Sequence, residues 1–429
     1  MPIAVPYRYR VLAFICSLTT LTYLCRTSIS IVGIKIKNDL GLNNAEFGWV
    51  VASFALAYAL FEIPAGAWGD RIGPRAVFIR IVLWWSLWTA ISGLAVGLVS
   101  LIIIRFLFGI GEAGSMPNSV LTISRWFPAQ ETGRALPWMG IGTQIGAAIA
   151  PLIVIPVANA FGWRVTFFVN AFIGLIWVLV CYSWFKNFPS EMRHISPKEL
   201  ELIESNRRYR KGVHLISWKI IFSNRTLLAL MGMYFCFQWA NYFFVAWMPV
   251  YLQEGLHFSE KNAQFIIFIL FVLGIVGLFS GGICIDWLAK NKGLFFGRRF
   301  MGMIGIGLCG LSIFCSAISA NAVAAASFLV SANFFYSFGV MSCYAVCTDI
   351  GRNNAGTVTG AMNCFGQLGA FFLAIVFGNM VNQGSSGISP LFVIAAAQLV
   401  GFLLWLIIDP TRPLPLSEEA QKSPAQAVQ

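Results

Sequence analysis

The sequence predicts an all-α polytopic membrane protein with twelve transmembrane helices in two six-helix bundles and with both termini in the cytoplasm. Only 11% of the 429 residues are charged while 58% are hydrophobic, and a soluble chain needs more charge than this to keep its surface hydrated. Apolar runs of about 20 residues recur along the chain, each long enough to cross a bilayer core of about 30 Å. The strand alternation of a β-barrel is not present in the pattern.

The apolar runs fall into two groups of six, separated by one long polar stretch. We expect spans at residues 11–34, 46–67, 76–96, 99–121, 136–158, 164–185, 226–251, 263–285, 299–319, 322–346, 356–379 and 388–408. The predicted domains are therefore a first bundle at 1–185, a cytoplasmic linker at 186–224 and a second bundle at 225–410. A tail at 411–429, rich in Pro, Ser, Ala and Gln, is expected to be disordered.

The linker carries one clear helix-start pattern. Ser196-Pro197-Lys198-Glu199 has the residues of a capping box, with proline at the first helical position. We expect a short amphipathic helix from here to about Arg208.

Basic residues gather at alternate helix ends, which sets the orientation. One set of ends, together with the linker, carries Arg8, Arg10, Arg71, Arg75, Arg80, Arg125, Arg134, Lys290, Lys292, Arg298, Arg299, Arg352, Arg412 and Lys422. The opposite ends carry only Lys35, Lys37, Arg164 and Lys261. This asymmetry places the basic side in the cytoplasm and accounts for the net charge of +12 without a nucleic-acid surface.

The ten cysteines all lie in apolar segments and form no Cys-x-x-Cys pair. We therefore expect neither a disulfide framework nor a metal site, and no cofactor.

The two halves repeat a short pattern at matching positions. Gly66–Arg75 (GAWGDRIGPR) follows the second span and Gly282–Arg299 (GICIDWLAKNKGLFFGRR) follows the eighth, each with glycine four residues before an aspartate. Duplicated bundles that rock about a central site are common among transporters. The alternative is that both are ordinary basic loops that obey the charge rule.

These segments resemble a known family. Gly66–Arg75 is similar to the loop 2–3 motif of the major facilitator superfamily. Arg105–Ser119 (RFLFGIGEAGSMPNS), Tyr58–Arg71 (YALFEIPAGAWGDR) and Phe161–Val169 (FGWRVTFFV) resemble the anion:cation symporter family, which includes bacterial sugar-acid transporters. The resemblance implies a twelve-helix alternating-access carrier of small organic anions, commonly driven by protons.

Four ionisable residues lie well inside predicted spans: Arg26, Glu62, Arg105 and Glu112. Such groups are costly in a membrane, face cavities or partners, and are functional candidates by default. Their formal charges sum to zero, which suggests that they compensate one another.

Arg26 shares a helical face with Thr22, Tyr23 and Ser30, at spacings of three and four. Its planar guanidinium suits a two-point contact with a carboxylate, so it is a candidate anchor for an anionic substrate. The alternative is a permanent ion pair with Glu112. The resemblance implies that the matching arginine binds the substrate carboxylate.

Arg105 and Glu112 are seven residues apart on one face, about 10 Å along the helix, so each is expected to meet a group on another helix. Small residues flank Glu112 and let a neighbouring helix approach closely. Burial favours its neutral form and a nearby arginine its charged form, a balance that suits proton coupling. The alternative is structural packing and pairing with an arginine. The resemblance implies that the matching glutamate and arginine couple protons.

Two positions depart from the family pattern. Glu62, on one face with Tyr58, stands where the family commonly has glutamine, and is either a snorkelling carboxylate near the cytoplasmic end or a coupling residue. Cys25 stands where bacterial sugar-acid symporters commonly have aspartate. The thiol is neutral in an apolar helix, which leaves Glu112, helped by Glu62, as the expected proton carrier.

Further polar residues within spans complete the expected substrate site. The resemblance implies substrate contacts by Tyr58, Gln144 and residues of the tenth and eleventh spans, and each alone is also explained by an interhelical hydrogen bond. The full expected set is Arg26, Tyr23, Tyr58, Gln144, Asn241, Tyr242, Ser342, Tyr344, Asn363 and Gln367. A conformational latch is expected at Gly66, Asp70, Arg71, Arg75 and Asp286.

The predicted function is a secondary transporter of the cell membrane that imports a small organic anion with protons, acting as a monomer. The rivals are an uncoupled or potential-driven uniporter, an exporter of the same architecture and a membrane sensor. The fifth span, Gly140–Val154, lacks the Gly-Pro-x-x-Gly-Gly ending usual in drug antiporters. No phosphate-binding loop, metal cluster or nucleophile–base spacing supports an enzyme.

Overall fold

The structure, a computed structural model, describes residues 5–128, 131, 134–205, 223–351, 355–382 and 389–411, except for the side chains of Asp70, Ala355, Gly356 and Asn382. Throughout these residues the regular elements are helices. Predictions for the linker beyond Ser205 and for the tail beyond Thr411 lie outside this part of the chain.

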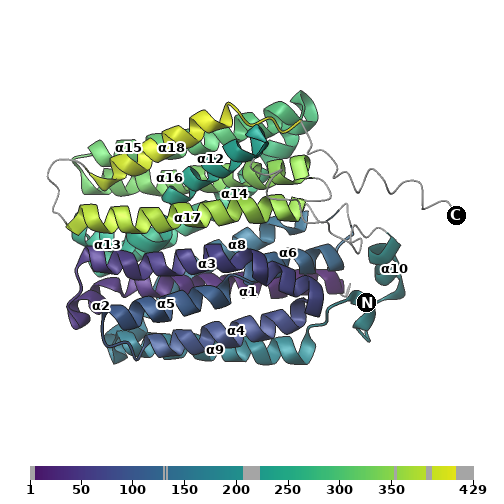
Figure 1. Ribbon diagram of the computed structural model, residues 1–429, viewed down its shortest axis with the longest axis horizontal. Helices are drawn as coiled ribbons and strands as arrows, with labels where there is room; N and C mark the ends of the chain where they lie inside the picture. Colours follow the sequence, from purple (N-terminus) through teal and green to yellow (C-terminus); the bar gives the residue numbers. More distant parts are fainter. Residues whose placement is uncertain are drawn as a thin grey trace.

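In the described residues, the first half of the molecule has eight helices, most of which lie nearly parallel in Figure 1. They are α1 (Tyr7–Ile31), α2 (Gly33–Leu40), α3 (Asn44–Ile72), α4 (Pro74–Ser92), α5 (Leu98–Glu112), α6 (Ser115–Trp126), α8 (Pro137–Phe161) and α9 (Trp163–Trp184). A 3-10 turn, η1 (Pro189–Glu191), and α10 (Pro197–Ser205) follow.

The second half is also helical and contains several π-helical turns. Its elements are α12 (Arg225–Tyr242), η2 (Phe243–Trp247), α13 (Met248–Val250), η3 (Tyr251–Gly255), α14 (Glu260–Lys292), η4 (Phe296–Phe300), α15 (Met301–Ile318), α16 (Ala322–Gly351), α17 (Ala355–Asn382) and α18 (Pro390–Trp405). The π-helical turn η2 directly follows Tyr242, and such turns are frequent at functional sites.

Within the described residues, eleven helical segments are long and apolar enough to cross a membrane. The eleven begin at Tyr7, and the fourth joins α5 and α6 into Leu98–Trp126. The twelfth expected span corresponds to α18, which is apolar but has only 16 residues. The all-helical prediction is confirmed, whereas twelve crossings, the domain boundaries and cytoplasmic termini stay predictions.

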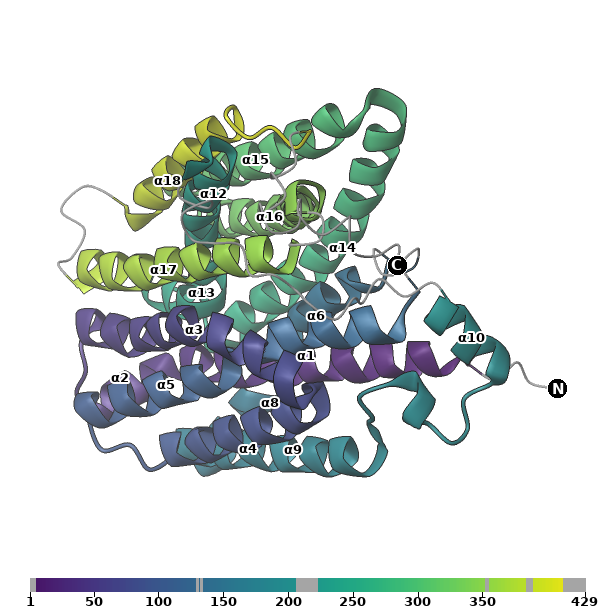
Figure 2. The same cartoon turned by 45° about the vertical axis from the view of Figure 1, so that its right-hand side comes forward.

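The two halves meet along two pairs of helices. Figures 1 and 2 show α3 beside α17 at the centre of the molecule, and α8 packs against α14. The backbones of α3 and α17 approach closely, because a Cβ atom on Gly48 would lie 2.7 Å from the carbonyl oxygen of Ala374. Glycine is therefore required at Gly48 by this contact.

One end of the molecule, which we call the α2 end, is formed by α2, η3 and the start of α14. Here the Lys37 ammonium lies 2.6 Å from a Glu254 carboxylate oxygen, and Lys35 lies 3.4 Å from Glu260. The Lys37 side chain is only 6% exposed. Both ion pairs join the first half to the second, so this end is held closed by charge.

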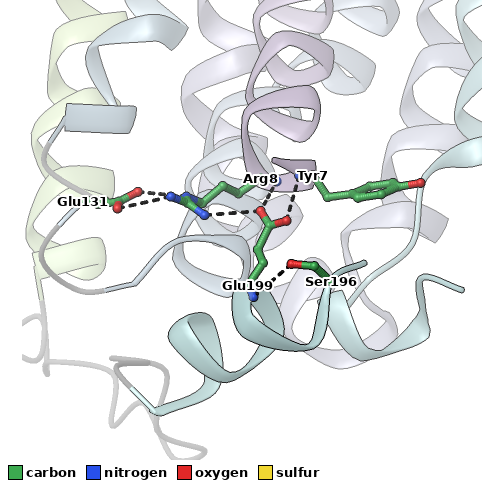
Figure 3. A network of polar contacts seen from close by, with 5 residues as sticks. All are labelled: Tyr7, Arg8, Glu131, Ser196 and Glu199. Carbon is green, nitrogen blue, oxygen red and sulfur yellow. Dashed lines mark hydrogen bonds and ion pairs between the residues drawn. The ribbon is translucent and has the colours of Figure 1, made fainter. Parts of the chain in front are cut away.

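The opposite end, the α10 end, carries the start of α1 and the linker helix (Figure 3). Glu199 of α10 accepts hydrogen bonds from the backbone N–H groups of Tyr7 and Arg8, at 3.0 Å each, so it caps the first turn of α1. The Arg8 guanidinium bridges Glu199, at 3.3 Å, and Glu131, at 3.0 Å. A carboxylate at a helix N-terminus satisfies free N–H groups and the helix dipole.

This arrangement corrects half of the predicted capping box. The Ser196 hydroxyl does accept a hydrogen bond from the Glu199 N–H, at 3.2 Å. The Glu199 side chain, however, turns to α1 instead of back to Ser196, because α1 offers two free N–H groups and a guanidinium. Ser196 therefore caps α10, whereas the Glu199 side chain caps α1.

Candidate functional site

A buried ion pair joins α1 to α5 in the middle of the first half. The Nε atom of Arg26 donates a hydrogen bond to Oε1 of Glu112 at 3.1 Å. Glu112 is fully buried and Arg26 is 6% exposed. The Nη2 atom of Arg26 and Oε2 of Glu112 have no hydrogen-bond partner in the described residues. The pair is thus made at one point only, and each member keeps a free polar atom.

Aromatic rings surround the Arg26 guanidinium. Its central carbon lies 4.8 Å from the ring centroid of Tyr23, 4.7 Å from that of Phe54 and 5.0 Å from that of Tyr58. A guanidinium over aromatic faces is stabilised by the ring quadrupoles. The rings come from α1 and α3, so two helices hold the positive charge in place.

Arg105 lies near Glu112 but makes no ion pair within 4 Å among the described residues. Its guanidinium carbon lies 5.1 Å from the Phe54 centroid and 4.5 Å from the Phe108 centroid. Arg105 is 2% exposed, and its Nε has no hydrogen-bond partner in the described part of the chain. Both arginines therefore contact the Phe54 ring, while only Arg26 is paired with a carboxylate.

The local sequence explains how Glu112 reaches this position. Helix α5 ends at Glu112 and α6 begins at Ser115, so the carboxylate stands where the helix is interrupted. A Cβ on Gly109 would lie 2.7 Å from the backbone oxygen of Phe54, and one on Gly111 would lie 2.4 Å from the Trp84 ring. The small residues next to Glu112 thus allow the close helix packing that the sequence predicted.

Cys25 is buried beside this cluster. It is 2% exposed and interacts electrostatically with both Arg105 and Glu112. The Cys25 thiol therefore stands beside both Arg105 and Glu112.

Glu62 is buried at the interface between the halves. It is 3% exposed, and its Oε1 accepts a hydrogen bond of 3.2 Å from Nδ2 of Asn363 on α17. The snorkelling alternative is therefore wrong, because the carboxylate is enclosed between α3 and α17 instead of reaching a polar surface.

Several other expected residues bridge the halves through hydrogen bonds. The Gln144 amide donates to the Ser337 hydroxyl at 2.9 Å, and the Tyr242 hydroxyl donates to the backbone oxygen of Val51 at 2.8 Å. These contacts match the interhelical alternative for each residue. They also place both side chains between the two halves.

The remaining expected substrate residues lie in the second half. The Tyr344 hydroxyl is 3.2 Å from that of Tyr234. Ser342 is fully buried, and its hydroxyl and Oε1 of Gln367 have no partner in the described residues. Asn241 is half-buried.

The expected latch residues make contacts inside their own halves. Nη2 of Arg75 donates to the backbone oxygen of Tyr182 at 2.6 Å. In the second half Asp286, 84% exposed, lies 3.5 Å from Arg298, which also pairs with Asp349 at 2.8 Å. Arg71 is exposed, a Cβ on Gly66 would lie 3.2 Å from Pro117, and the Asp70 side chain lies outside the described part.

Three contributors were missed at the sequence level. Phe54 touches both arginines, Ser337 holds Gln144, and Tyr234 meets Tyr344. Phe54 could have been found, because it lies four residues before Tyr58 on the same helical face. No group of three or more His, Cys, Asp or Glu residues that could hold a metal ion is found where the structure describes the chain.

Comparison with known proteins shows what the chain is similar to. It is 29% identical over 410 residues to a protein of Cupriavidus necator described as a probable sulfoacetate transporter, covering 94% of each chain. It is 28% identical over 424 residues to the hexuronate transporter of Bacillus subtilis, covering 96% of this chain and 97% of the relative. It is also 28% identical over 418 residues to a D-galactonate transporter of Escherichia coli, covering 94% and 95%.

A solved structure shares the fold. A bacterial homologue of the human lysosomal transporter Spinster, in an inward-facing and unoccupied conformation, matches with a TM-score of 0.69 at 19% identity, covering 94% of this chain and 95% of that one. The relatives are named as transporters and none of the three as an enzyme. Residues 15–374 match the Major Facilitator Superfamily model, so the chain is a multi-pass cell-membrane transporter that belongs to the Major Facilitator Superfamily.

Proposed function

We propose that the chain imports a small organic anion, such as a sugar acid or a related carboxylate, together with protons by alternating access. The observation that carries this proposal is the buried, one-point ion pair between Arg26 and Glu112. Named relatives transport sulfoacetate, hexuronate and D-galactonate, which are all organic anions.

The pair links proton binding to anion binding. Glu112 accepts the hydrogen bond from Nε of Arg26. A proton on Glu112 removes the negative charge that holds the guanidinium. Arg26 is then free to offer its planar fork to an anionic group of the substrate. Because the proton and the anion both favour separation of the same pair, each promotes the binding of the other.

Arg105 supports this exchange as a second fixed positive charge. It contacts the same Phe54 ring as Arg26, and its Nε has no hydrogen-bond partner among the described residues. Its positive charge adds to the attraction for an anion. Once Glu112 is neutral, the positive charges of Arg105 and Arg26 repel each other. We assign Arg105 to proton coupling with Glu112 on this basis.

The polar residues that bridge the halves connect binding to movement. The Gln144–Ser337 and Glu62–Asn363 hydrogen bonds cross from one half to the other. A substrate that hydrogen-bonds to these side chains replaces contacts between the halves with contacts to itself. Binding thereby changes what holds the halves together, as a rocking carrier requires.

The anion anchor is tested by uptake into proteoliposomes. Sulfoacetate, D-galactonate, D-glucarate and D-glucuronate are first screened by thermal shift, and uptake of the ligands found is measured with the pH gradient and the membrane voltage imposed separately. Arg26→Ala is expected to abolish uptake while leaving the protein folded, and Arg80→Ala, at an exposed arginine of α4, serves as the control. Uptake retained by Arg26→Ala would sink the anchor role.

The coupling role is tested with Glu112→Gln. This variant is expected to lose accumulation driven by a pH gradient and to keep counterflow exchange, because exchange needs no net proton movement. Accumulation that survives in Glu112→Gln excludes this residue as the coupling site. Wild-type uptake that depends on the membrane voltage alone indicates a uniporter. Transport that runs only in the direction corresponding to exit from the cell indicates an exporter.

A further inference from the structure

Glu62 occupies a position that the exchange at Arg26 and Glu112 does not use. It lies on α3, and among the described residues its one hydrogen-bond partner is the neutral amide of Asn363 on α17. Its other oxygen, Oε2, is buried without a partner in the described residues. The carboxylate therefore has unused hydrogen-bonding capacity inside a closed interface.

Among the described residues, the surroundings of Glu62 contain no cation that is not already paired with a carboxylate. Titratable groups face it from α1, α3, α16 and α17: Arg26, Tyr58, Tyr344 and Cys364. Arg26 is the one cation among them, and it is already paired with Glu112. No ion pair of Glu62 is found among the described residues, and a buried carboxylate without a partner cation is costly in its charged form.

The neighbouring contacts show that this interface must be disrupted for water to reach Glu62. One residue along α17, the Cys364 thiol donates to the backbone oxygen of Ala59 on α3, at 3.4 Å. Together, the Asn363 amide at the carboxylate and the Cys364 thiol at Ala59, three residues before Glu62 on α3, tie the two helices. When α3 and α17 part, both contacts break and the carboxylate meets solvent, which favours the charged form.

We propose that Glu62 is a second proton-binding group of the transport cycle, neutral while α3 and α17 are packed together and ionised when they part. This inference rests on the proposed function, because a transport cycle must open and close this interface. The proton enters from the solution on the side where the interface opens first, binds a carboxylate oxygen of Glu62, and leaves when the interface opens again. Asn363 acts as the positioning residue that holds the carboxylate across the interface.

The test is the number of protons carried per anion. Purified protein is reconstituted with a pH dye inside the vesicles, and proton entry is measured alongside entry of radiolabelled sulfoacetate or D-galactonate. Glu62→Gln keeps the size and the hydrogen-bond acceptor but cannot ionise. It is expected to transport with about one proton fewer per anion than the wild type.

Two further variants separate charge from shape. Glu62→Asp keeps an ionisable group and is expected to keep a ratio above that of Glu62→Gln. Glu201→Gln, at an exposed carboxylate of α10, is expected to leave the ratio unchanged.

The possible outcomes distinguish this inference from the proposed function. An unchanged proton-to-anion ratio in Glu62→Gln overturns the role of Glu62 and leaves anion transport standing. Failure of the wild type to bind or carry any of the four anions overturns the proposed function, and the role of Glu62 with it. A lowered ratio in Glu62→Gln alone supports the inference.

Discussion

The two ends of the molecule differ in what their ion pairs connect. At the α2 end, Lys37 with Glu254 and Lys35 with Glu260 each join the first half to the second. At the α10 end, the pairs of Arg8 with Glu199 and of Arg298 with Asp349 stay inside one half or tie it to the linker. Among the described residues, charge therefore fastens the halves together at the α2 end and ties groups within one half or to the linker at the α10 end. We infer a carrier that is closed at the α2 end and able to part at the α10 end.

The largest effect is expected from Glu254→Ala. It leaves the nearly buried Lys37 ammonium without a carboxylate, at a cost of about 1.4 kcal/mol, which is about tenfold in the closed-to-open ratio. Faster hydrogen–deuterium exchange in residues 32–44 and 247–260 measures the loss of closure. The double variant with Lys37→Glu and Glu254→Lys is expected to restore protection, and unchanged exchange in the single variant would show that this pair does not hold the end closed.

A smaller and local effect is expected from Glu199→Ala at the α10 end. The first turn of α1 loses its cap, which costs about 1 kcal/mol and lowers the midpoint of thermal unfolding. Exchange at the α2 end stays as in the wild type, because Glu199 ties the linker to the first half only. Lys198→Ala, at an exposed neighbour, is the control. Loss of protection at the α2 end would contradict the separation between the ends.

Glu260→Ala tests the outer member of the crossing pairs and is expected to matter less. The Lys35 and Glu260 side chains are 33% and 35% exposed, and such pairs contribute below about 1 kcal/mol. The change in exchange at the α2 end is expected to be less than about threefold and to shrink further in high salt. An effect as large as that of Glu254→Ala would show that burial of Lys37 is not what makes its pair dominant.

The smallest effect concerns a pair inside the first half, between Asp39 of α2 and Arg164 of α9. A hydrogen bond from the Arg164 guanidinium holds the pKa of the Asp39 carboxyl below its usual value of 3.8. A carboxyl whose pKa is lowered on folding stabilises the protein above its ordinary pKa, and this contribution is lost as the pH falls through the lowered value.

Arg164→Ala should therefore lower the unfolding midpoint slightly at about pH 6, and the difference from the wild type should shrink towards about pH 3. Thermal unfolding scans at a series of pH values measure it. A difference that grows as the pH falls has the wrong sign and would contradict the assignment to Asp39.

The sequence was informative where the physical rule is local. Hydropathy located the membrane helices because a bilayer demands about 20 apolar residues in a row. The rarity of charge within these helices singled out Arg26, Glu62, Arg105 and Glu112, and the structure finds all four buried. The pairing of Arg26 with Glu112 was one of the two alternatives that the residues alone suggested.

The sequence was less informative where partners are far apart in the chain. Nothing local to Ser196–Glu199 distinguishes a self-contained capping box from a carboxylate that caps α1, about 190 residues earlier. The same holds for Glu62, since its enclosure depends on Asn363, 301 residues away. Lys37 resembles an ordinary charged residue near a helix end, and the sequence does not indicate that Glu254, 217 residues away, lies beside its ammonium.

The cap supplied by Glu199 also has a consequence for the order of biosynthesis. The first turn of α1 is made before the other helices of the first half, yet the carboxylate that completes it is added only after them. Until then the N–H groups of Tyr7 and Arg8 must be satisfied by water or lipid headgroups. Because α10 precedes α12 in the chain, the cap of the first half is synthesised before the helices of the second half.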